Sequence, residues 1–320
     1  MSIVTVIIPT HNDGAFLEEA LESVFRQTFR DFDVIVVNDG STDDTEARLR
    51  KYRARIRYVY QECRGPAASR NLAIRATQSP LVAFLDADDQ WLPKKLETQV
   101  RFAEASPSVG IITTDVEWFN ENGVTNSSLK SRYPISSGFV IEQLIFHNWI
   151  STSAAMVRRE CFGRAGWFDE EPGIYGEDWM MWVQIAAQYP VQFVDQVLTR
   201  RRVRSDSLEQ RNAEAQFNNL FRNLEKMQAT VPALSQRPEL LREAAYRICM
   251  ERGKQDLRLL NTLGAKNKFR KACGYFPLRA RPRIYLFASI LPSRLLGLAK
   301  RTFRAMTPSI RGGTAAAKRA

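Results

Sequence analysis

The stretch AFLDADDQW, residues 83–91, places Asp86, Asp88 and Asp89 within four positions, directly after an apolar run. Carboxylates this close repel one another, and a bound cation relieves that repulsion. Because Asp86 and Asp88 stand two positions apart, both face the same side of an extended segment and can address one ligand. Their oxygen donors suit Mg²⁺ or Mn²⁺, ions that also bridge to substrate phosphates. The competing explanation is helix capping, and we expect Asp89 to cap the helix that begins near Pro93.

Two further polar residues lie in similar surroundings. Asp39, in VVNDGSTDD, follows a second apolar run. It is either part of a turn before a helix or a carboxylate that accepts hydrogen bonds from a base or a sugar. Arg70, in GPAASRNLAI, carries a planar guanidinium that suits phosphate or carboxylate, although most helical arginines are simply solvated.

The remaining acid pair is Glu177 and Asp178, in YGEDWMMW. Acids in the first turn of a helix are stabilised by its dipole, which explains the pair without any chemistry. The bulky Trp179 and Trp182 that follow indicate a rim with limited water. A carboxylate in such a place is a candidate general base.

The elements that must position these residues alternate regularly. Strand-like runs in IVTVII, FDVIVVNDGS, IRYVYQE and SPLVAFLDADD are each followed by a helical pattern, all within about the first 105 residues. This alternation is typical of an α/β protein with a mainly parallel sheet and helices on both faces. Ligands bind such sheets at the carboxyl ends of the strands. The polar clusters at 9–12, 38–41 and 86–89 should therefore converge.

The pattern changes along the rest of the chain. A strand is expected in VGIITTDVEWF, a helix in YGEDWMMWVQIAAQY and a late strand in VQFVDQVLTRRRV. From about residue 208 the pattern is helical and carries no candidate chemistry. We therefore expect one domain over 1–207, divided near residue 105, and a helical, basic region over 208–320.

Composition restricts the class of protein. With 44% hydrophobic and 25% charged residues among 320, the chain is typical of a globular protein. The four cysteines are far apart and have no zinc-ligand spacing, which favours a reduced intracellular compartment. The N-terminus is typical of a first strand rather than a signal peptide, and no apolar run approaches the ~20 residues that span a bilayer. We expect a cytoplasmic protein.

The net charge of +11 is concentrated in the C-terminal region. Residues after Asp256 contain fifteen of the 46 basic residues and none of the 35 acidic ones, so the preceding part has a net charge of −4. Residues 281–306 interleave Arg and Lys with Ile, Leu and Phe, a pattern that suits the anionic cytoplasmic face of the inner membrane. The alternative is a helical appendage with a solvated basic face. Nucleic acid is not expected as a partner, since the segment has no recognisable reading module, and 311–320 is expected to be disordered.

Taken in order, VIIPTHN, LESVFRQTFRDFDVIVVNDGSTDDT, GPAASRNLAI, VAFLDADDQWLPKKLE, GWFDE and GEDW resemble the family 2 glycosyltransferases of the GT-A fold. The resemblance covers roughly residues 3–205. For the donor, it implies a nucleotide sugar, usually a UDP-sugar. Pro9, Thr10 and Asp39 would line the nucleobase, Arg70 would lie near the base or the diphosphate, and Asp86 would approach the ribose.

The resemblance also implies the chemistry. Asp88, with Asp86, would hold a divalent metal, Mn²⁺ or Mg²⁺, on the diphosphate. Asp178 would be the catalytic base and Glu177 would position the acceptor, a glycan or lipid-linked hydroxyl. One displacement would invert the anomeric configuration, as in the synthesis of bacterial surface polysaccharides.

The chain departs from the family pattern at two places. Many relatives have an additional aspartate where this chain has Met180 and Met181, and many have a histidine where it has Arg204. Arg201, Arg202 or Arg204 could stabilise the diphosphate directly, the site could bind metal less tightly, or these arginines could simply be solvated at the end of a basic strand.

Other functions are weighed against this one. A nucleotidyltransferase would need a basic, glycine-rich loop after the first strand, and a dinucleotide-dependent oxidoreductase would need G-x-G-x-x-G after a strand; the sequence has neither. A non-catalytic glycan- or membrane-binding protein on a degenerate transferase domain remains the alternative.

Overall fold

The computed structural model describes residues 1–171, 175–204 and 213–290. The chain divides into two compact units, Met1–Arg237 and a second unit that begins at Pro238.

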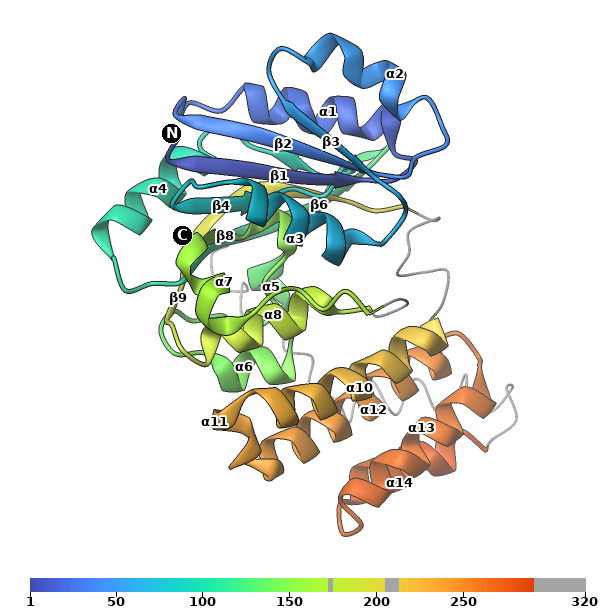
Figure 1. The fold of residues 1–320 in the computed structure, drawn as a ribbon. Coiled ribbons are helices and arrows are strands. Elements are labelled where there is room, and N and C mark those ends of the chain that lie inside the picture. The colour runs from blue at the N-terminus through green and yellow to red at the C-terminus, as the bar shows by residue number, and fades with distance from the viewer. Residues whose placement is uncertain (172–174, 205–212, 291–320) are drawn as a thin grey trace, which may run out of the picture. The chain divides into compact units, whose positions relative to one another are not determined.

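The first unit opens with the predicted alternation of strands and helices (Figure 1). Strands β1, β2, β3 and β4 are parallel neighbours in the order β3-β2-β1-β4. Their bounds, with those of the intervening helices, are β1 Val4–Thr10, α1 Gly14–Phe25, β2 Phe32–Asp39, α2 Thr45–Leu49, η1 Arg50–Tyr52, β3 Arg57–Gln61, α3 Pro66–Ala76, β4 Leu81–Phe84 and α4 Lys95–Ala105. The expectation of a mainly parallel sheet over about the first 105 residues is confirmed.

The sheet is covered on both faces, which explains its continuous apolar strands. Every residue of β1 is buried. Alternate residues such as Val6 and Ile8 pack with Leu17 and Leu21 of α1, whereas α3 lies against the opposite face (Figure 1). On that second face Phe84 packs against aromatic rings from the later half of the unit. The two layers fix the carboxyl ends of the strands relative to one another.

The later half of the first unit extends the same sheet with mixed pairing: β8 is antiparallel to β4 and β6, whereas β6 and β9 are parallel to each other. Among the described residues the full order is β3-β2-β1-β4-β8-β6-β9-β5, with β7 paired to β6. The elements are β5 Gln90–Trp91, β6 Ile111–Asn120, β7 Gly123–Ser128, α5 Leu129–Arg132, α6 Ile141–Phe146, η2 Thr152–Ala154, β8 Met156–Arg158, α7 Arg159–Ala165, α8 Glu177–Ala186 and β9 Val191–Arg202. Strands β6 and β9 and helix α8 were predicted; the short β5, β7 and β8 were not, because two to six residues carry too little periodicity.

The first unit extends past the boundary expected near residue 208. Helices α10 (Ala213–Thr230) and α11 (Pro232–Ser235) belong to it. The Asn223 side chain donates hydrogen bonds to the carbonyl oxygens of Tyr175 and Gly176, at 3.0 and 3.1 Å. These bonds attach α10 to the start of α8, so the helical pattern alone did not mark the end of the compact unit.

The second unit is helical, as expected. It contains α12 Pro238–Arg258, α13 Thr262–Tyr275 and α14 Ala280–Ala288. Phe269 is fully buried and stacks on Tyr285 at a centroid distance of 5.2 Å. Of the basic segment 281–306, only the part up to Ile290 is described; residues 291–306, and the 311–320 segment expected to be disordered, lie outside the described residues. In the described part of the chain, no helix is both long enough and apolar enough to span a membrane.

Candidate active site

The loops after β1 and β2 are joined by hydrogen bonds at the carboxyl edge of the sheet. His11 Nδ1 lies 2.7 Å from the carbonyl oxygen of Asp39, and the Asn12 amide donates to Ser41 Oγ at 3.0 Å. Asn12 has a φ of +58° and its side-chain oxygen accepts from the Thr42 amide at 2.7 Å. The polar clusters at 9–12 and 38–41 are therefore adjacent, as predicted.

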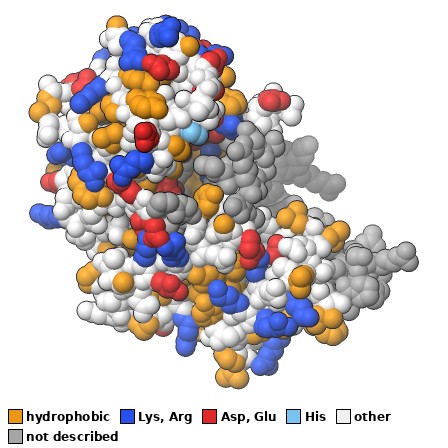
Figure 2. Space-filling view, turned by 45° about the vertical axis from the view of Figure 1, so that its right-hand side comes forward, with side chains coloured by type: hydrophobic (Ala, Val, Ile, Leu, Met, Phe, Trp, Pro, Cys, Tyr) orange, Lys and Arg blue, Asp and Glu red, His pale blue; other side chains and the backbone are white. Residues whose placement is uncertain are grey.

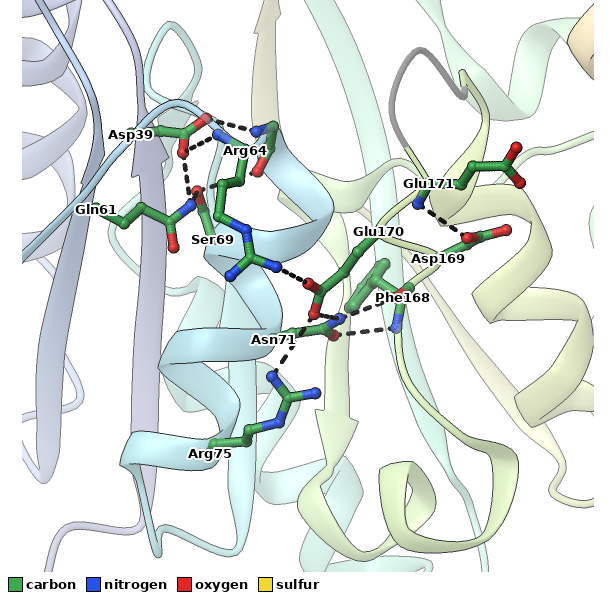
Figure 3. A network of polar contacts seen from close by, with 11 residues as sticks. Asp39, Gln61, Arg64, Ser69, Asn71, Arg75, Phe168, Asp169, Glu170 and Glu171 are labelled. Carbon is green, nitrogen blue, oxygen red and sulfur yellow. Dashed lines mark hydrogen bonds and ion pairs between the residues drawn. The ribbon is translucent and has the colours of Figure 1, made fainter.

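Asp39 is buried and shapes the start of α3. Its Oδ1 accepts from the Arg64 amide at 2.9 Å and from Gln61 Nε2, and its Oδ2 accepts from the Gly65 amide at 2.8 Å (Figure 3). Gly65 has a φ of +90°, which a residue with a side chain rarely adopts. The carboxylate thus holds the strand end, the loop and the helix start together.

A polar network continues from this loop to the segment before α8. Figure 3 shows the Arg64 side chain reaching Glu170, and the Nη2–Oε2 distance is 3.0 Å. Glu170 also accepts from Asn71 Nδ2 at 2.8 Å, and Asn71 exchanges hydrogen bonds with the backbone of Phe168. Helix α3 therefore fixes the position of 168–170.

Arg70 lies at the centre of the site and is only 4% exposed. Its Nη2 donates to Asp86 Oδ1 at 2.9 Å and its Nη1 to Glu177 Oε1 at 2.7 Å. Burial alone would lower the pKa of the guanidinium, but the carboxylates of Asp86 and Glu177 outweigh burial and raise that pKa. A permanent positive charge therefore lies between two acids that come from distant parts of the chain.

The turn after β4 is held by Ser153. Its Oγ accepts from the Asp86 amide at 3.1 Å and donates to Asp89 Oδ2 at 2.6 Å. Asp89, 2% exposed, also accepts from the Arg202 amide at 2.9 Å. The prediction that Asp89 caps the next helix is wrong: α4 begins at Lys95, and the Asp89 carboxylate is used inside the turn instead. A buried carboxylate is tolerated there because both its oxygens accept hydrogen bonds.

Asp88 faces a second arginine. Arg204 Nη1 lies 3.5 Å from Asp88 Oδ2 and also donates to Asp13. Burial, followed by the nearby carboxylates of Asp86 and Asp13, raises the pKa of Asp88 to about 6, and Arg204 opposes this rise. Three aspartates thus crowd one corner of the site, where added positive charge is stabilising.

The carboxylates at this corner fit a divalent cation that takes further oxygen ligands from elsewhere. Within the described residues, no three His, Cys, Asp or Glu side chains are arranged to bind a metal alone. Mg²⁺ and Mn²⁺ sites of phosphate-transferring enzymes commonly use one or two carboxylates, with phosphate oxygens and water completing the shell. The observation that favours a cation there is the crowding of acids: Asp88 and Asp13 lie close enough to share one guanidinium, and burial, followed by the nearby Asp86 and Asp13 carboxylates, raises the pKa of Asp88. Asp88 and Asp86 are the residues that would hold it.

Asp178 lies in the first turn of α8, next to Glu177. Its Oδ1 accepts from the Trp179 amide at 2.6 Å and its Oδ2 from Thr152 Oγ1 at 3.1 Å. Burial, and then the charge of Glu177, raise the pKa of Asp178 to about 6, while Arg70 lowers it. A carboxylate with this pKa is a competent proton acceptor near neutral pH.

Several site residues could not be found from the sequence. Ser153 and Thr152, which contact the predicted aspartates, belong to the short η2 segment and have no motif around them. Asp13 lies one position beyond the polar cluster at 9–12. Its position directly after the first strand is the one feature of the sequence that could have identified it as a site residue. Two predicted residues have polar atoms that lack a partner in the described structure: Thr10 Oγ1 and Arg70 Nε.

Comparison with known proteins identifies the class. The glycosyl transferase family 2 model matches residues 5–164, and the chain belongs to this family. An uncharacterized glycosyltransferase of Rickettsia felis is 34% identical over 202 residues, which are 62% of this chain and 33% of the relative. The chain therefore spans about a third of that relative's length. A Bacillus subtilis glycosyltransferase assigned to teichuronic acid biosynthesis, TuaG, is 40% identical over 104 residues, 31% of this chain and 41% of TuaG.

Solved structures share the fold. The S. aureus TarS 1–349 structure in complex with UDP-GlcNAc has a TM-score of 0.66 at 18% identity, covering 97% of this chain and 93% of that one. The Pyrobaculum calidifontis mannosyltransferase PcManGT, in complex with GDP-Man and Mn²⁺, has a TM-score of 0.61 at 21% identity, covering 95% and 84%. The protein is thus a family 2 glycosyltransferase with a GT-A type of fold.

Proposed function

We propose that this protein transfers a sugar from a UDP-sugar to a hydroxyl of a glycan or lipid-linked acceptor, with inversion at the anomeric carbon. The observation that carries the proposal is the pair of hydrogen bonds from Arg70 to Asp86 and to Glu177. They bring the strand-end acids of the nucleotide half next to the acids that open α8. A donor and an acceptor hydroxyl bound there would meet beside Asp178.

On the donor side, the proposed roles belong to residues at strand ends and to Arg70 of α3. Pro9, Thr10 and Asp39 would receive the nucleobase; Asp39 Oδ2 accepts one hydrogen bond within the protein and has capacity for another, which a uracil N–H would fill. Arg70 would lie near the base or the diphosphate. Asp86, with 38% of its side chain exposed, would approach the ribose.

In the proposed reaction, the acceptor oxygen forms a bond to the anomeric carbon as the bond from that carbon to the diphosphate oxygen breaks. The hydroxyl proton passes to Asp178, whose raised pKa suits this role. Glu177, held by Arg70, would position the acceptor. When bound at Asp88, a divalent cation neutralises charge on the leaving diphosphate. A single displacement inverts the configuration and needs no covalent intermediate.

The C-terminal region would bring this activity to an anionic membrane surface on the cytoplasmic side. In the second unit, exposed apolar side chains such as Leu278 and Phe287 accompany exposed Arg281 and Arg283, and no acid follows Asp256. On the face drawn in Figure 2, hydrophobic, basic and acidic side chains are interspersed. This composition suits adsorption to anionic lipid, where lipid-linked acceptors reside. A vesicle co-sedimentation assay with and without anionic lipid tests it.

The decisive experiment is release of UDP from a UDP-sugar by wild type and by Asp178→Asn. We expect the variant to lose at least about 100-fold in kcat while still binding UDP. Asp195→Asn is the matched control, because Asp195 is an exposed acid of β9 that pairs with Lys130. Equal turnover by Asp178→Asn and wild type would contradict the assignment of the base.

A second candidate function is non-catalytic binding of a glycan or membrane by a degenerate transferase domain. The observations that favour it are Arg204 beside Asp88, where many relatives have a histidine, and the buried Met180 and Met181, where many relatives have an additional aspartate. Binding of UDP by wild type without any sugar transfer, across a panel of UDP-sugars and acceptors, would favour this candidate over the first.

A further inference from the structure

Arg204 lies at the corner of the site where Asp13 and Asp88 come together. Its Nη1 donates to Asp13 Oδ1, lies 3.5 Å from Asp88 Oδ2, and only 17% of its side chain is exposed. The guanidinium also lies over the Phe16 ring, 4.4 Å from its centroid. Acids from the loops after β1 and β4 are therefore joined through one arginine from the end of β9.

The neighbouring Arg202 fixes this arrangement. Its Nε donates to the carbonyl oxygen of Asp88 at 2.9 Å, and its backbone amide donates to Asp89. Its guanidinium lies between two rings, 4.8 Å from the Phe16 centroid and 4.4 Å from that of Phe119. The end of β9 is thus attached to the aspartate turn by its backbone and side chain. Arg204, two residues later, is held beside Asp88 rather than being a solvated end of a basic strand.

The charges at this corner show what Arg204 contributes. Asp86 is paired with Arg70, while Asp13 and Asp88 share Arg204. A divalent ion on Asp88 would have to share that carboxylate with the Arg204 guanidinium, whose Nη1 lies 3.5 Å from Oδ2, and two cations on one carboxylate repel each other. The guanidinium itself is a good phosphate ligand, because its fork of N–H donors matches two phosphate oxygens.

We propose that Arg204 is a built-in diphosphate-binding cation of this site, so that a nucleoside diphosphate binds with little dependence on divalent metal. The inference rests on the proposed function, since it needs a nucleotide at the aspartate corner. Arg204 would turn from Asp13 and Asp88 to the diphosphate, and its removal would leave the metal as the main counter-charge. The site would then become strongly metal-dependent.

The test is calorimetric titration of the full chain with UDP, once with Mn²⁺ and once with EDTA. For wild type we expect the dissociation constants for UDP in the two conditions to differ by less than about tenfold, because the charge-assisted contact from Arg204 to the diphosphate is retained without metal. For Arg204→Ala we expect binding in EDTA to weaken by at least about tenfold, and Mn²⁺ to restore most of it. Arg204→Lys, which keeps the charge, should bind in EDTA more tightly than Arg204→Ala.

The control is Arg200→Ala. Arg200 lies on β9, shortly before Arg204, but its side chain pairs with Glu117 at 2.6 Å rather than with the aspartates, so its removal should leave UDP binding unchanged. Circular dichroism establishes whether each variant is folded. If Arg204→Ala does not fold, Arg204→Lys takes its place in the comparison with wild type. Loss of UDP binding by wild type in EDTA would overturn the role proposed for Arg204 but not the proposed function. Equal UDP binding by wild type and Arg204→Ala in EDTA would do the same. No UDP binding by wild type in either condition would overturn the proposed function as well.

Discussion

Arg70 Nη1 lies 2.7 Å from Glu177 Oε1, although the two residues are 107 positions apart in the sequence. The same guanidinium donates to Asp86, so removal of Arg70 leaves two acids close together without their counter-charge. We expect Arg70→Ala to lower the free energy of unfolding by about 3–5 kcal/mol, as measured by urea denaturation. Arg75→Ala is the control on the same helix: Arg75 is 52% exposed and lies 3.6 Å from Glu170, so a loss of at most about 1 kcal/mol is expected. Similar losses for the two variants would refute the central role of Arg70.

The pH dependence of the rate should report Asp178. Because the pKa of its carboxyl is raised to about 6, the base is protonated and inactive below that pH. We expect kcat/KM to rise about tenfold per pH unit up to pH 6 and to level off above it. The measurement is initial UDP release between pH 4.5 and 8. A profile that is flat between pH 5 and 7 would exclude Asp178 as the base.

The ionised carboxylate of Asp178 should also lower the free energy of unfolding at neutral pH. Its folded pKa lies above its usual value of 3.8, so the folded state holds the proton more tightly. The contribution of Asp178 to stability therefore falls as pH rises from about 4 to about 6 and is constant above. We expect Asp178→Asn to be more stable than wild type at pH 7.5, by up to about 3 kcal/mol, and not at pH 4. Thermal melts at the two pH values check this, and a lower melting temperature of the variant at pH 7.5 would contradict it.

Ser153 should matter through its hydroxyl rather than its size. Ser153 Oγ accepts from the Asp86 amide and donates to the buried Asp89, so Ser153→Ala leaves both groups short of a partner. We expect a loss of about 1–3 kcal/mol of unfolding free energy and weaker UDP binding. Thr113→Val is the matched control, since Thr113 Oγ1 is also buried but has no partner among the described residues. That variant should be neutral or slightly more stable by chemical denaturation, and a loss as large as that of Ser153→Ala would argue against the hydrogen bonds as the cause.

Gly40 should be required for the turn that follows Asp39. It has a φ of +70°, and a Cβ atom there would lie 2.8 Å from the Cys63 amide nitrogen. Gly40→Ala is therefore expected to lower the unfolding free energy by at least about 1 kcal/mol and to disturb the Asp39 loop. Gly163→Ala provides the comparison: Gly163 lies in α7, where an added Cβ has no neighbour within 4 Å, and the substitution should be neutral or stabilising. Thermal melts of the two variants check this: backbone strain should lower the melting temperature of Gly40→Ala, whereas the better helix propensity of Ala should keep or raise that of Gly163→Ala.

Much of the fold was predictable because its signals are local. The apolar runs and helical patterns of the first 105 residues predicted β1 to β4 in a mainly parallel sheet. The strand ends then indicated that 9–12, 38–41 and 86–89 lie together, since parallel strands present their carboxyl ends at one edge. Periodicity and turn chemistry act over a few residues, so these features can be read directly from the chain.

The contacts made by the acids were decided only by the tertiary structure. Asp89 was expected to cap a helix and instead lies between Ser153 and the Arg202 amide, 64 and 113 positions away. Arg204 reaches Asp13 and Asp88 because β9 lies beside β6 and β5, an order that no local pattern encodes. The sequence by itself determined which residues end the strands and open α8. Register, strand order and the packing of distant segments determined which side chains those residues meet, because such contacts depend on the folding of the whole unit.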